Sequence, residues 1–235
     1  MHELVGHVAA ITRYPVKSMA GEPRDAAEID WQGMEGDRQW AFVKQGDATR
    51  FPWFTGRDLS ELVRYRADYD DPADPRRSPV MVTAPSGERW PLASPALHDR
   101  LAAASGRALT LLQLGIGAYD AMPLSVVSTA SFAALEAAHG APLERRRFRA
   151  NIVVESEGRD AQWAGRRLYF GEGGAALSLA AGAPRCAMVT IDPDTAERDA
   201  RVLRTVAQAF GNAFTTYASV ARPGTMQVGD AVWLD

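Results

Sequence analysis

Short apolar segments separated by turn residues constrain the fold of this chain more than any other feature of its sequence. In the first half they recur over Val8–Thr12, Ala26–Ile29, Arg38–Val43, Leu62–Tyr69 and Val80–Thr83. Apolar runs of this length, bounded by glycine, proline and small polar residues, are typical of β-strands. After the last of them, Pro85–Glu88 predicts a hairpin turn. The first half is therefore expected to consist mainly of strands.

The rest of the chain mixes helices with further strands. Helices are predicted over Pro95–Ala104, which Gly106 stops, over Ala130–His139, which Ser128 or Thr129 caps and Gly140 ends, and over about Thr195–Phe210. Strands are expected over Leu124–Val127, Arg149–Val154, Arg167–Phe170, Ala176–Leu179, Ala187–Ile191, Thr215–Ala221 and Gln227–Leu234. This order is neither a strict strand–helix alternation nor all-helical, so it predicts a β-rich α+β fold with partly closed sheets.

The length and the cysteine count limit the possible architectures. A chain of 235 residues corresponds to one large domain or two small, closely packed ones. The single cysteine, Cys186, excludes an intramolecular disulfide and any zinc or iron–sulfur site that needs several cysteines. Any special chemistry of Cys186 must therefore use one thiol.

The charge balance argues against two classes of partner. Lysine and arginine total 26 against 29 aspartates and glutamates, so no overall positive field attracts nucleic acid or an acidic membrane. Residues 1–5 show no basic region followed by an apolar core, and no apolar run approaches the roughly 20 residues that span a bilayer. We therefore expect a cytoplasmic protein that binds neither nucleic acid nor membrane.

Cys186 is the first candidate functional residue. It lies in the segment Ala183–Cys186 between two apolar segments, and its neighbour Arg185 favours the thiolate, the form that attacks electrophiles or binds a soft metal. The alternative is a buried cysteine that acts as a small hydrophobic residue, which is the commoner case for a lone cysteine.

Two further segments are suited to binding anions. Lys17, one of only two lysines, stands beside Ser18 after the first expected strand, where an ammonium group and a hydroxyl can bind an anion together. The alternative is an ordinary solvated lysine. Arg38 begins another expected strand and can contact phosphate or carboxylate with two hydrogen bonds, unless Asp37 simply neutralises it.

A third segment combines a cation with a carboxamide. Arg149 and Asn151 stand two residues apart in an expected strand, so both should project from the same face, where they can read the edge of a heterocycle. Equally, either side chain can tie down a neighbouring loop. No nucleotide-binding glycine motif, phosphate loop, zinc-protease motif or hydrolase elbow is present in the sequence.

Taken in order along the chain, several segments resemble the MOSC superfamily, the C-terminal domain of molybdenum cofactor sulfurase, preceded by its N-terminal β-barrel partner. The resembling segments are Tyr14–Ser18, Gly36–Arg38, Thr55–Arg57, Phe148–Val153, Pro184–Cys186, Thr190–Thr195 and Arg222–Asp230. The motifs are most similar to those of the mitochondrial amidoxime-reducing components and their bacterial counterparts, which reduce N-hydroxylated compounds at a molybdenum centre. The resemblance implies an N-terminal β-barrel-like domain over residues 1–115 and a MOSC domain over residues 116–235.

The resemblance also implies roles for individual residues. Cys186 corresponds to the cysteine that binds molybdenum in this family. The remaining residues implied to hold the molybdenum cofactor are Lys17, Ser18, Arg38, Arg57, Arg149, Asn151 and Arg185. The implied substrate is a small N-hydroxylated or N-oxide molecule. Electrons are expected from a separate reductase or ferredoxin-like protein, because the sequence contains no motif for a second redox group.

The sequence departs from the amidoxime-reducing pattern in three places. Asp120-Ala121-Met122 replaces the small hydroxyl residues that precede the proline in those relatives, and Pro184 replaces a serine before Arg185. The segment from Asn151 to Trp163 is also shorter. Its acids, Glu155, Glu157 and Asp160, could place a carboxylate near the metal for proton transfer, but solvated loop acids are the preferred interpretation.

The sequence therefore predicts a molybdenum-dependent oxidoreductase that reduces N-hydroxylated or N-oxide compounds by oxo transfer. One alternative is a sulfur carrier in which Cys186 holds a persulfide for delivery to an acceptor. Another is a MOSC protein that has lost cofactor binding and serves a structural role.

Overall fold

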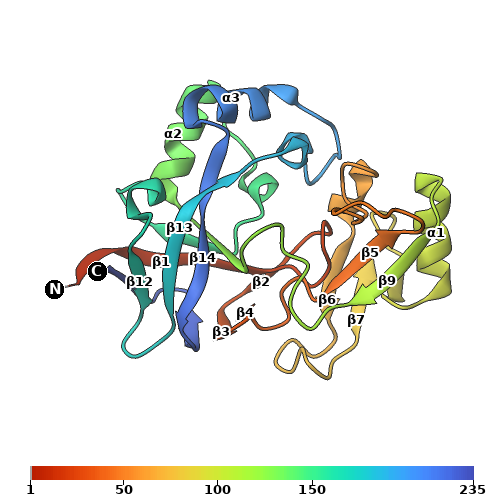
Figure 1. Ribbon diagram of the computed structural model, residues 1–235, viewed down its shortest axis with the longest axis horizontal. Coiled ribbons are helices and arrows are strands. Elements are labelled where there is room, and N and C mark those ends of the chain that lie inside the picture. The colour runs from red at the N-terminus through yellow and green to blue at the C-terminus, as the bar shows by residue number, and fades with distance from the viewer. Residues whose placement is uncertain (1) are drawn as a thin grey trace.

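The computed structural model describes residues 2–235 and is built around a closed β-barrel of seven strands (Figure 1). The strands follow one another in the order β1-β11-β10-β14-β13-β12-β16, and β1 closes the ring by pairing with both β11 and β16. They are β1 (Glu3–Arg13), β10 (Leu124–Ser128), β11 (Ile152–Glu155), β12 (Arg167–Phe170), β13 (Ala176–Pro184), β14 (Ala213–Arg222) and β16 (Ala231–Leu234). The barrel and the accompanying helices confirm the prediction of a β-rich α+β fold.

The first strand belongs to the barrel although all the other barrel strands come from the second half of the chain. Antiparallel pairing sets Ile11 opposite Ile152 in β11 and Glu3 opposite Leu234 in β16. Gly6 lies at an irregularity in the pairing with β16, and a Cβ atom there would lie 1.9 Å from the carbonyl oxygen of Glu155. The division into domains at residues 115 and 116 stays a prediction.

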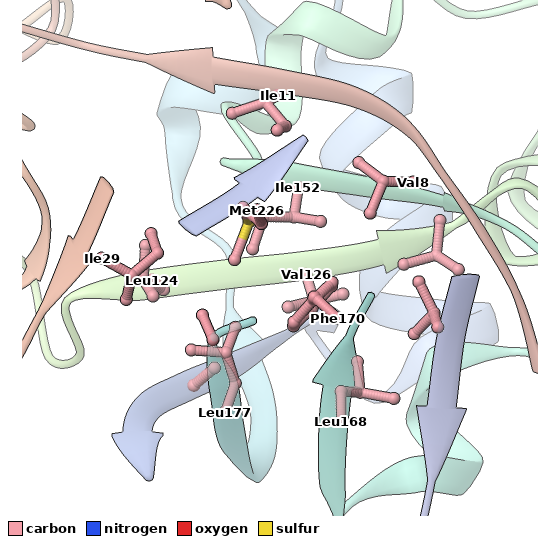
Figure 2. Packing of buried hydrophobic residues seen from close by; sticks show 14 of the residues in the cluster. Val8, Ile11, Ile29, Leu124, Val126, Ile152, Leu168, Phe170, Leu177 and Met226 are labelled. Atoms are coloured by element: carbon pink, nitrogen blue, oxygen red, sulfur yellow. The ribbon is translucent and has the colours of Figure 1, made fainter. Parts of the chain in front are cut away.

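Alternating side chains of these strands fill the barrel interior (Figure 2). In β12, for example, Leu168 and Phe170 are fully buried while Arg167 is exposed, which is the two-residue period of a strand with one face in the core. Val126, Ile152 and Phe170 belong to the same cluster. Because side chains fill the interior, a ligand site has to lie outside the barrel core.

Three smaller sheets flank the barrel, two of them on the side where Figure 1 shows β5, β9, β6 and β7. One sheet consists of β3 (Ala26–Asp30), β4 (Gly33–Met34) and β15 (Gly224–Gln227), and a second pairs β5 (Trp40–Lys44) with β9 (Leu109–Gln113). The third consists of β6 (Arg66–Tyr69), β7 (Val80–Thr83) and β8 (Arg89–Pro91). The short strand β2 (Glu22–Arg24) pairs with β1. The predicted hairpin turn between β7 and β8 is confirmed by a hydrogen bond from Gly87 N to Ala84 O of 2.9 Å. The sheets β5-β9 and β6-β7-β8 enclose a second hydrophobic core around Phe42, Phe54 and Leu97, whereas Ile29 and Met226 of the sheet β15-β3-β4 join the barrel core.

The helices begin and end as their capping residues dictate. They are α1 (Pro95–Ser105), α2 (Thr129–His139) and α3 (Ala200–Phe210). Ser128 caps α2 by accepting a hydrogen bond from Ser131 N, and Gly140 ends it in the left-handed conformation, as predicted. The predicted start of α3 at Thr195 is wrong, because Asp199 caps the helix and the preceding residues form a turn around Asp192.

Several predicted strands have different boundaries or a different conformation. Ser60–Arg64 and Ala187–Thr190 are short 3-10 helices, so the strands expected over Leu62–Tyr69 and Ala187–Ile191 are wrong in those parts. The strand expected over Gln227–Leu234 is divided by a turn in which Asp230 N donates to Gln227 O. The expected strand Arg149–Val154 begins only at Ile152.

None of the helices within residues 2–235 has both the length and the apolar character needed to cross a membrane.

Phe170→Ala should lower the free energy of unfolding by about 3–5 kcal/mol, because it removes a fully buried ring and leaves a cavity in the barrel core. The matched control is Val228→Ala, since the Val228 side chain is 44% exposed in the turn before β16. Urea titration followed by circular dichroism measures both variants. Equal losses in the two would contradict the assignment of Phe170 to the core.

Candidate functional site

A single cavity of about 410 Å³ brings together every residue that the sequence predicts for the site. Its walls come from residues 17–57 on one side and residues 119–217 on the other, so it lies where the N-terminal segments meet the barrel. We call it the first cavity. The predicted residues among its lining are Lys17, Ser18, Arg38, Arg57, Arg149, Asn151, Arg185 and Cys186.

Cys186 presents its thiol at the cavity wall. It follows the end of β13 and caps the 3-10 helix Ala187–Thr190, and its side chain is exposed. The backbone N–H of the preceding Arg185 donates to Asn212 O at 2.9 Å and anchors this turn. The interpretation of Cys186 as a small buried hydrophobic residue is therefore wrong, and the thiol is available to a ligand.

Arg185 carries its charge into the protein without a carboxylate partner among the described residues. Its Nη2 donates to Phe148 O at 2.7 Å, its Nη1 lies 3.4 Å from Phe214 O and from Thr215 Oγ1, and its Nε has no partner. Burial lowers the pKa of Arg185, because the charged guanidinium group loses its hydration there. An anion in the cavity would compensate this cost.

Arg38 and Arg149 share Tyr14 as a support. Both residues have a φ of 52°, and their guanidinium carbons lie 4.7 Å and 4.3 Å from the centre of the Tyr14 ring. This left-handed conformation explains why the strands expected at Arg38 and Arg149 begin later, at Trp40 and Ile152. Arg149 and Asn151 consequently do not project from one face of a strand as predicted.

The charges of these two arginines are balanced unequally. Arg38 forms an ion pair with the fully buried Asp37, whereas Arg149 donates to Met19 O at 2.6 Å and leaves its Nη2 without a partner. Burial, reinforced by the nearby charge of Arg38, lowers the pKa of Arg149 to about 10. Asp37 therefore neutralises Arg38 in part, as the alternative interpretation held, and Arg149 remains uncompensated.

Lys17 is buried, with 7% of its surface exposed, so the interpretation as a solvated lysine is wrong. Its Nζ donates to Ala118 O at 2.6 Å and to Asp120 Oδ1 at 2.8 Å. Burial lowers the pKa of Lys17, although Asp120 opposes this effect. Ser18 is buried beside it with a φ of 66°, so the Lys17–Ser18 pair lies in the cavity wall.

Asn151 ties the cavity wall together. Its Nδ2 donates to Thr12 O at 3.2 Å, and its Oδ1 accepts from Arg38 Nη1 at 3.2 Å and from Ser125 N at 3.3 Å. Both ends of the carboxamide therefore form hydrogen bonds within the protein, as expected if Asn151 holds neighbouring segments together. Arg57, by contrast, is exposed and lies 4.7 Å from the centre of the Phe51 ring.

The cavity lining also includes charged and polar residues that were not predicted for the site, among them Arg147, Asp120 and Tyr217. Arg147 donates to Thr190 O at 2.9 Å and forms an ion pair with Asp192 at 2.7 Å. Asp120 was noted only as a departure from the family pattern, and Tyr217 comes from the middle of β14. Arginine is too common in this chain for Arg147 to stand out by its type.

The three loop acids considered for proton transfer lie elsewhere. None of Glu155, Glu157 and Asp160 lines the first cavity. Glu155 and Glu157 are exposed, as the preferred interpretation holds. Asp160 is buried instead, because it accepts hydrogen bonds from Ser128 N at 3.0 Å and Thr216 Oγ1 at 2.7 Å.

The first cavity is strongly cationic. One carboxylate, Asp120, lines it together with the cationic side chains of Lys17, Arg38, Arg57, Arg147, Arg149 and Arg185. Three buried nitrogen atoms in residues 2–235 lack a hydrogen-bond partner, and all three belong to this lining: Arg147 Nε, Arg149 Nη2 and Arg185 Nε. A buried donor without an acceptor costs free energy, so these atoms indicate a site for a ligand with several anionic oxygens.

Two family models match the chain. The MOSC domain matches residues 114–233, and the MOSC N-terminal beta barrel domain matches residues 5–121. Mitochondrial amidoxime reducing component 2 from Bos taurus is 26% identical, and the alignment covers 97% of this chain and 83% of the bovine protein. The crystal structure of the YUAD protein from Bacillus subtilis superposes with a TM-score of 0.54 at 15% identity, covering 100% of this chain and 98% of that one. The likeness to YUAD shows a shared fold.

Inorganic pyrophosphate should raise the thermal midpoint of the wild-type protein, because a ligand that binds only the folded state stabilises it. Arg185→Met should weaken that binding by about tenfold, as the loss of one charge-assisted hydrogen bond predicts. Arg100→Met is the matched control, since Arg100 pairs with Glu88 away from the cavity. Differential scanning fluorimetry over a pyrophosphate series measures all three proteins. An equal response of Arg185→Met and wild type would remove Arg185 from the anion site.

Proposed function

This chain belongs to the MOSC domain family, and from that premise we propose that its first cavity binds a molybdenum cofactor for the reduction of N-hydroxylated or N-oxide compounds. The MOSC domain and the likeness to an amidoxime reducing component indicate a function associated with this cofactor. The proposal adds the identity of the metal ligand, the class of substrate and the mechanism.

The unpaired buried nitrogens of Arg147, Arg149 and Arg185 are the observation that carries the proposal. A pterin cofactor with a phosphate group offers both ring acceptors and anionic oxygens, and this cavity offers directed donors and uncompensated positive charge. The volume of about 410 Å³ lies within the range of small-molecule and cofactor sites. The residues present therefore fit such a group.

Each part of the cavity has its own task toward the cofactor. Lys17, Ser18 and Arg38 bind its phosphate and pterin, and Arg149 and Arg185 neutralise its charge. Asn151 acts through Arg38, because its Oδ1 accepts a hydrogen bond from that guanidinium group. Arg57, stacked on Phe51, adds a further cation on the exposed side of the wall.

Cys186 is the protein ligand to the metal in this proposal. A thiolate is a soft ligand that suits molybdenum, and the buried cation of Arg185 is its neighbour in the chain. When bound at Cys186, the cofactor would supply two-electron oxo-transfer chemistry at molybdenum. The protein orients the group, compensates its charge and excludes water.

Reduction of an N-hydroxyl group to an amine releases one water molecule and consumes two electrons and two protons. We propose that the electrons come from a separate reductase or a ferredoxin-like protein, because one cysteine cannot hold an iron–sulfur cluster. The substrate enters as a small molecule through the same cavity that exposes the thiol of Cys186.

The exposure of the Cys186 thiol also favours a second candidate function, sulfur transfer through a persulfide. In that case the fold acts as a binding module, and the purified protein carries a reactive persulfide without molybdenum or pterin. A protein that lacks both cofactor and persulfide, and that has no anion affinity at Lys17 and Arg38, would instead serve a structural role.

Cys186→Ala should abolish the reduction of an amidoxime while leaving the fold intact, because the thiol is exposed and the change in volume is small. The protein is expressed in a host that makes the cofactor and assayed with a chemical electron donor. Molybdenum and pterin per chain are measured in the same preparations. Near-stoichiometric cofactor in the wild type excludes a pure sulfur carrier, and full activity of Cys186→Ala would refute ligation by the thiol.

Lys17→Ala should reduce the amount of cofactor that survives purification, since it removes a charge-assisted contact with the phosphate. The other lysine provides the matched control: Lys44 pairs with Asp47 and Asp58 and does not line the cavity. Lys44→Ala should therefore retain the cofactor as the wild type does. Unchanged molybdenum content in Lys17→Ala would exclude Lys17 from the cofactor site.

A further inference from the structure

A second cavity of about 390 Å³ adjoins the first and shares Arg147, Arg149 and Met188 with it. Its other walls come from residues 12–23, from residues 63–66 and from residues 191–194. It does not include Cys186, Lys17 or Arg38. The second cavity therefore lies on the other side of the arginine wall, where the N-terminal segments meet the barrel, and the proposed function leaves it unused.

The second cavity is also cationic. One carboxylate, Asp194, lines it together with Arg64, Arg66, Arg146, Arg147 and Arg149. Two of these arginines are neutralised: Arg146 pairs with Asp194 at 2.6 Å and Arg147 pairs with Asp192 at 2.7 Å. The remaining three therefore decide what the cavity attracts.

Those three arginines have little or no compensation. The side chain of Arg66 is exposed and has no hydrogen-bond or ion-pair partner within residues 2–235, and that of Arg64 reaches only the exposed Glu61, at 4.0 Å. Arg149 contacts no carboxylate in the same residues, and its Nη2 is unpaired. Arg147, although paired, has a side chain only 10% exposed with an unpaired Nε. The wall thus offers both free charge and free donors to an anion.

The rest of the lining is mostly apolar and includes one aromatic residue, Tyr14, which is 4% exposed. The Tyr14 ring lies in this wall, with the guanidinium carbon of Arg149 4.3 Å from its centre. Val63 and Met188 add aliphatic surface. A Cβ atom at Gly21 would lie 2.6 Å from Tyr14 Cε1, so this glycine lets the chain approach the edge of the ring. Rings and guanidinium planes stack well on flat, polarisable groups.

We propose that the second cavity binds a small organic anion with a flat apolar body, in the class of aromatic phosphates and carboxylates. The anionic group pairs with Arg64 and Arg66, and the body packs against Val63, Met188 and the small exposed part of Tyr14. The volume suits a ligand of this size, since small-molecule sites range from about 300 to 1,000 Å³. This site does not depend on the molybdenum cofactor, so it stands or falls separately from the proposed function.

The test uses the full chain with its single thiol capped by N-ethylmaleimide, which obstructs the first cavity at Cys186 and leaves the second open. Isothermal titration calorimetry then compares three probes: phenyl phosphate, inorganic phosphate and phenol. We expect one equivalent of phenyl phosphate to bind, and inorganic phosphate and phenol to bind at least about tenfold more weakly, because each supplies only half of the contacts.

Charge removal at the second cavity provides the next comparison. Arg64→Met combined with Arg66→Met should weaken phenyl phosphate binding by about tenfold or more. The matched control is Arg77→Met combined with Arg107→Met, which removes the same charge from two exposed positions outside both cavities. Thermal midpoints of both double variants verify that they remain folded.

Three results would overturn the proposal. Loss of phenyl phosphate binding on capping would place the ligand in the first cavity. Equal affinity of the Arg64/Arg66 double variant and the wild type would show that these arginines do not form the site. Equal affinity for phenyl phosphate and inorganic phosphate would show that the apolar wall takes no part in recognition.

Discussion

The antiparallel pairing of β1 with β11 is the interaction on which the fold and both cavities depend. It closes the barrel and joins residues that are about 140 positions apart, through Thr12 N to Asn151 O at 2.8 Å and Asn151 Nδ2 to Thr12 O at 3.2 Å. The segment after β1 carries Tyr14, Lys17 and Ser18, and the segment before β11 carries Arg147 and Arg149. Closing the barrel therefore also brings the two halves of the cationic wall together.

This arrangement has an energetic cost that a ligand can offset. Buried guanidinium groups lose hydration, and Arg149 and Arg185, whose pKa values burial lowers, lack carboxylate partners. The stacked Tyr14 ring and backbone carbonyl acceptors hold these groups in place without neutralising them. The cationic groups are therefore held in a fixed geometry before a ligand binds, and such preorganisation favours the recognition of an anion.

The sequence predicted the composition of the site better than its geometry. Motifs located Lys17, Arg38, Arg185 and Cys186, and the structure places them in one cavity. Local patterns failed where the backbone departs from strand conformation: Arg38 and Arg149 have positive φ, which their residue type does not signal. Arg147 was missed because its role depends on burial rather than on its identity.

Asp120 shows why a single carboxylate belongs in so cationic a cavity. Burial lowers the pKa of Lys17, and a neutral amine would contribute no charge to anion binding; the contact with Asp120 at 2.8 Å acts in the opposite direction. Although burial opposes it, the same contact lowers the pKa of Asp120, so the contact favours the charged forms of both partners. The Asp120 side chain is 59% exposed, so water partly compensates it. One acid at the edge thereby counteracts the effect of burial on Lys17 without cancelling the charge of the arginines.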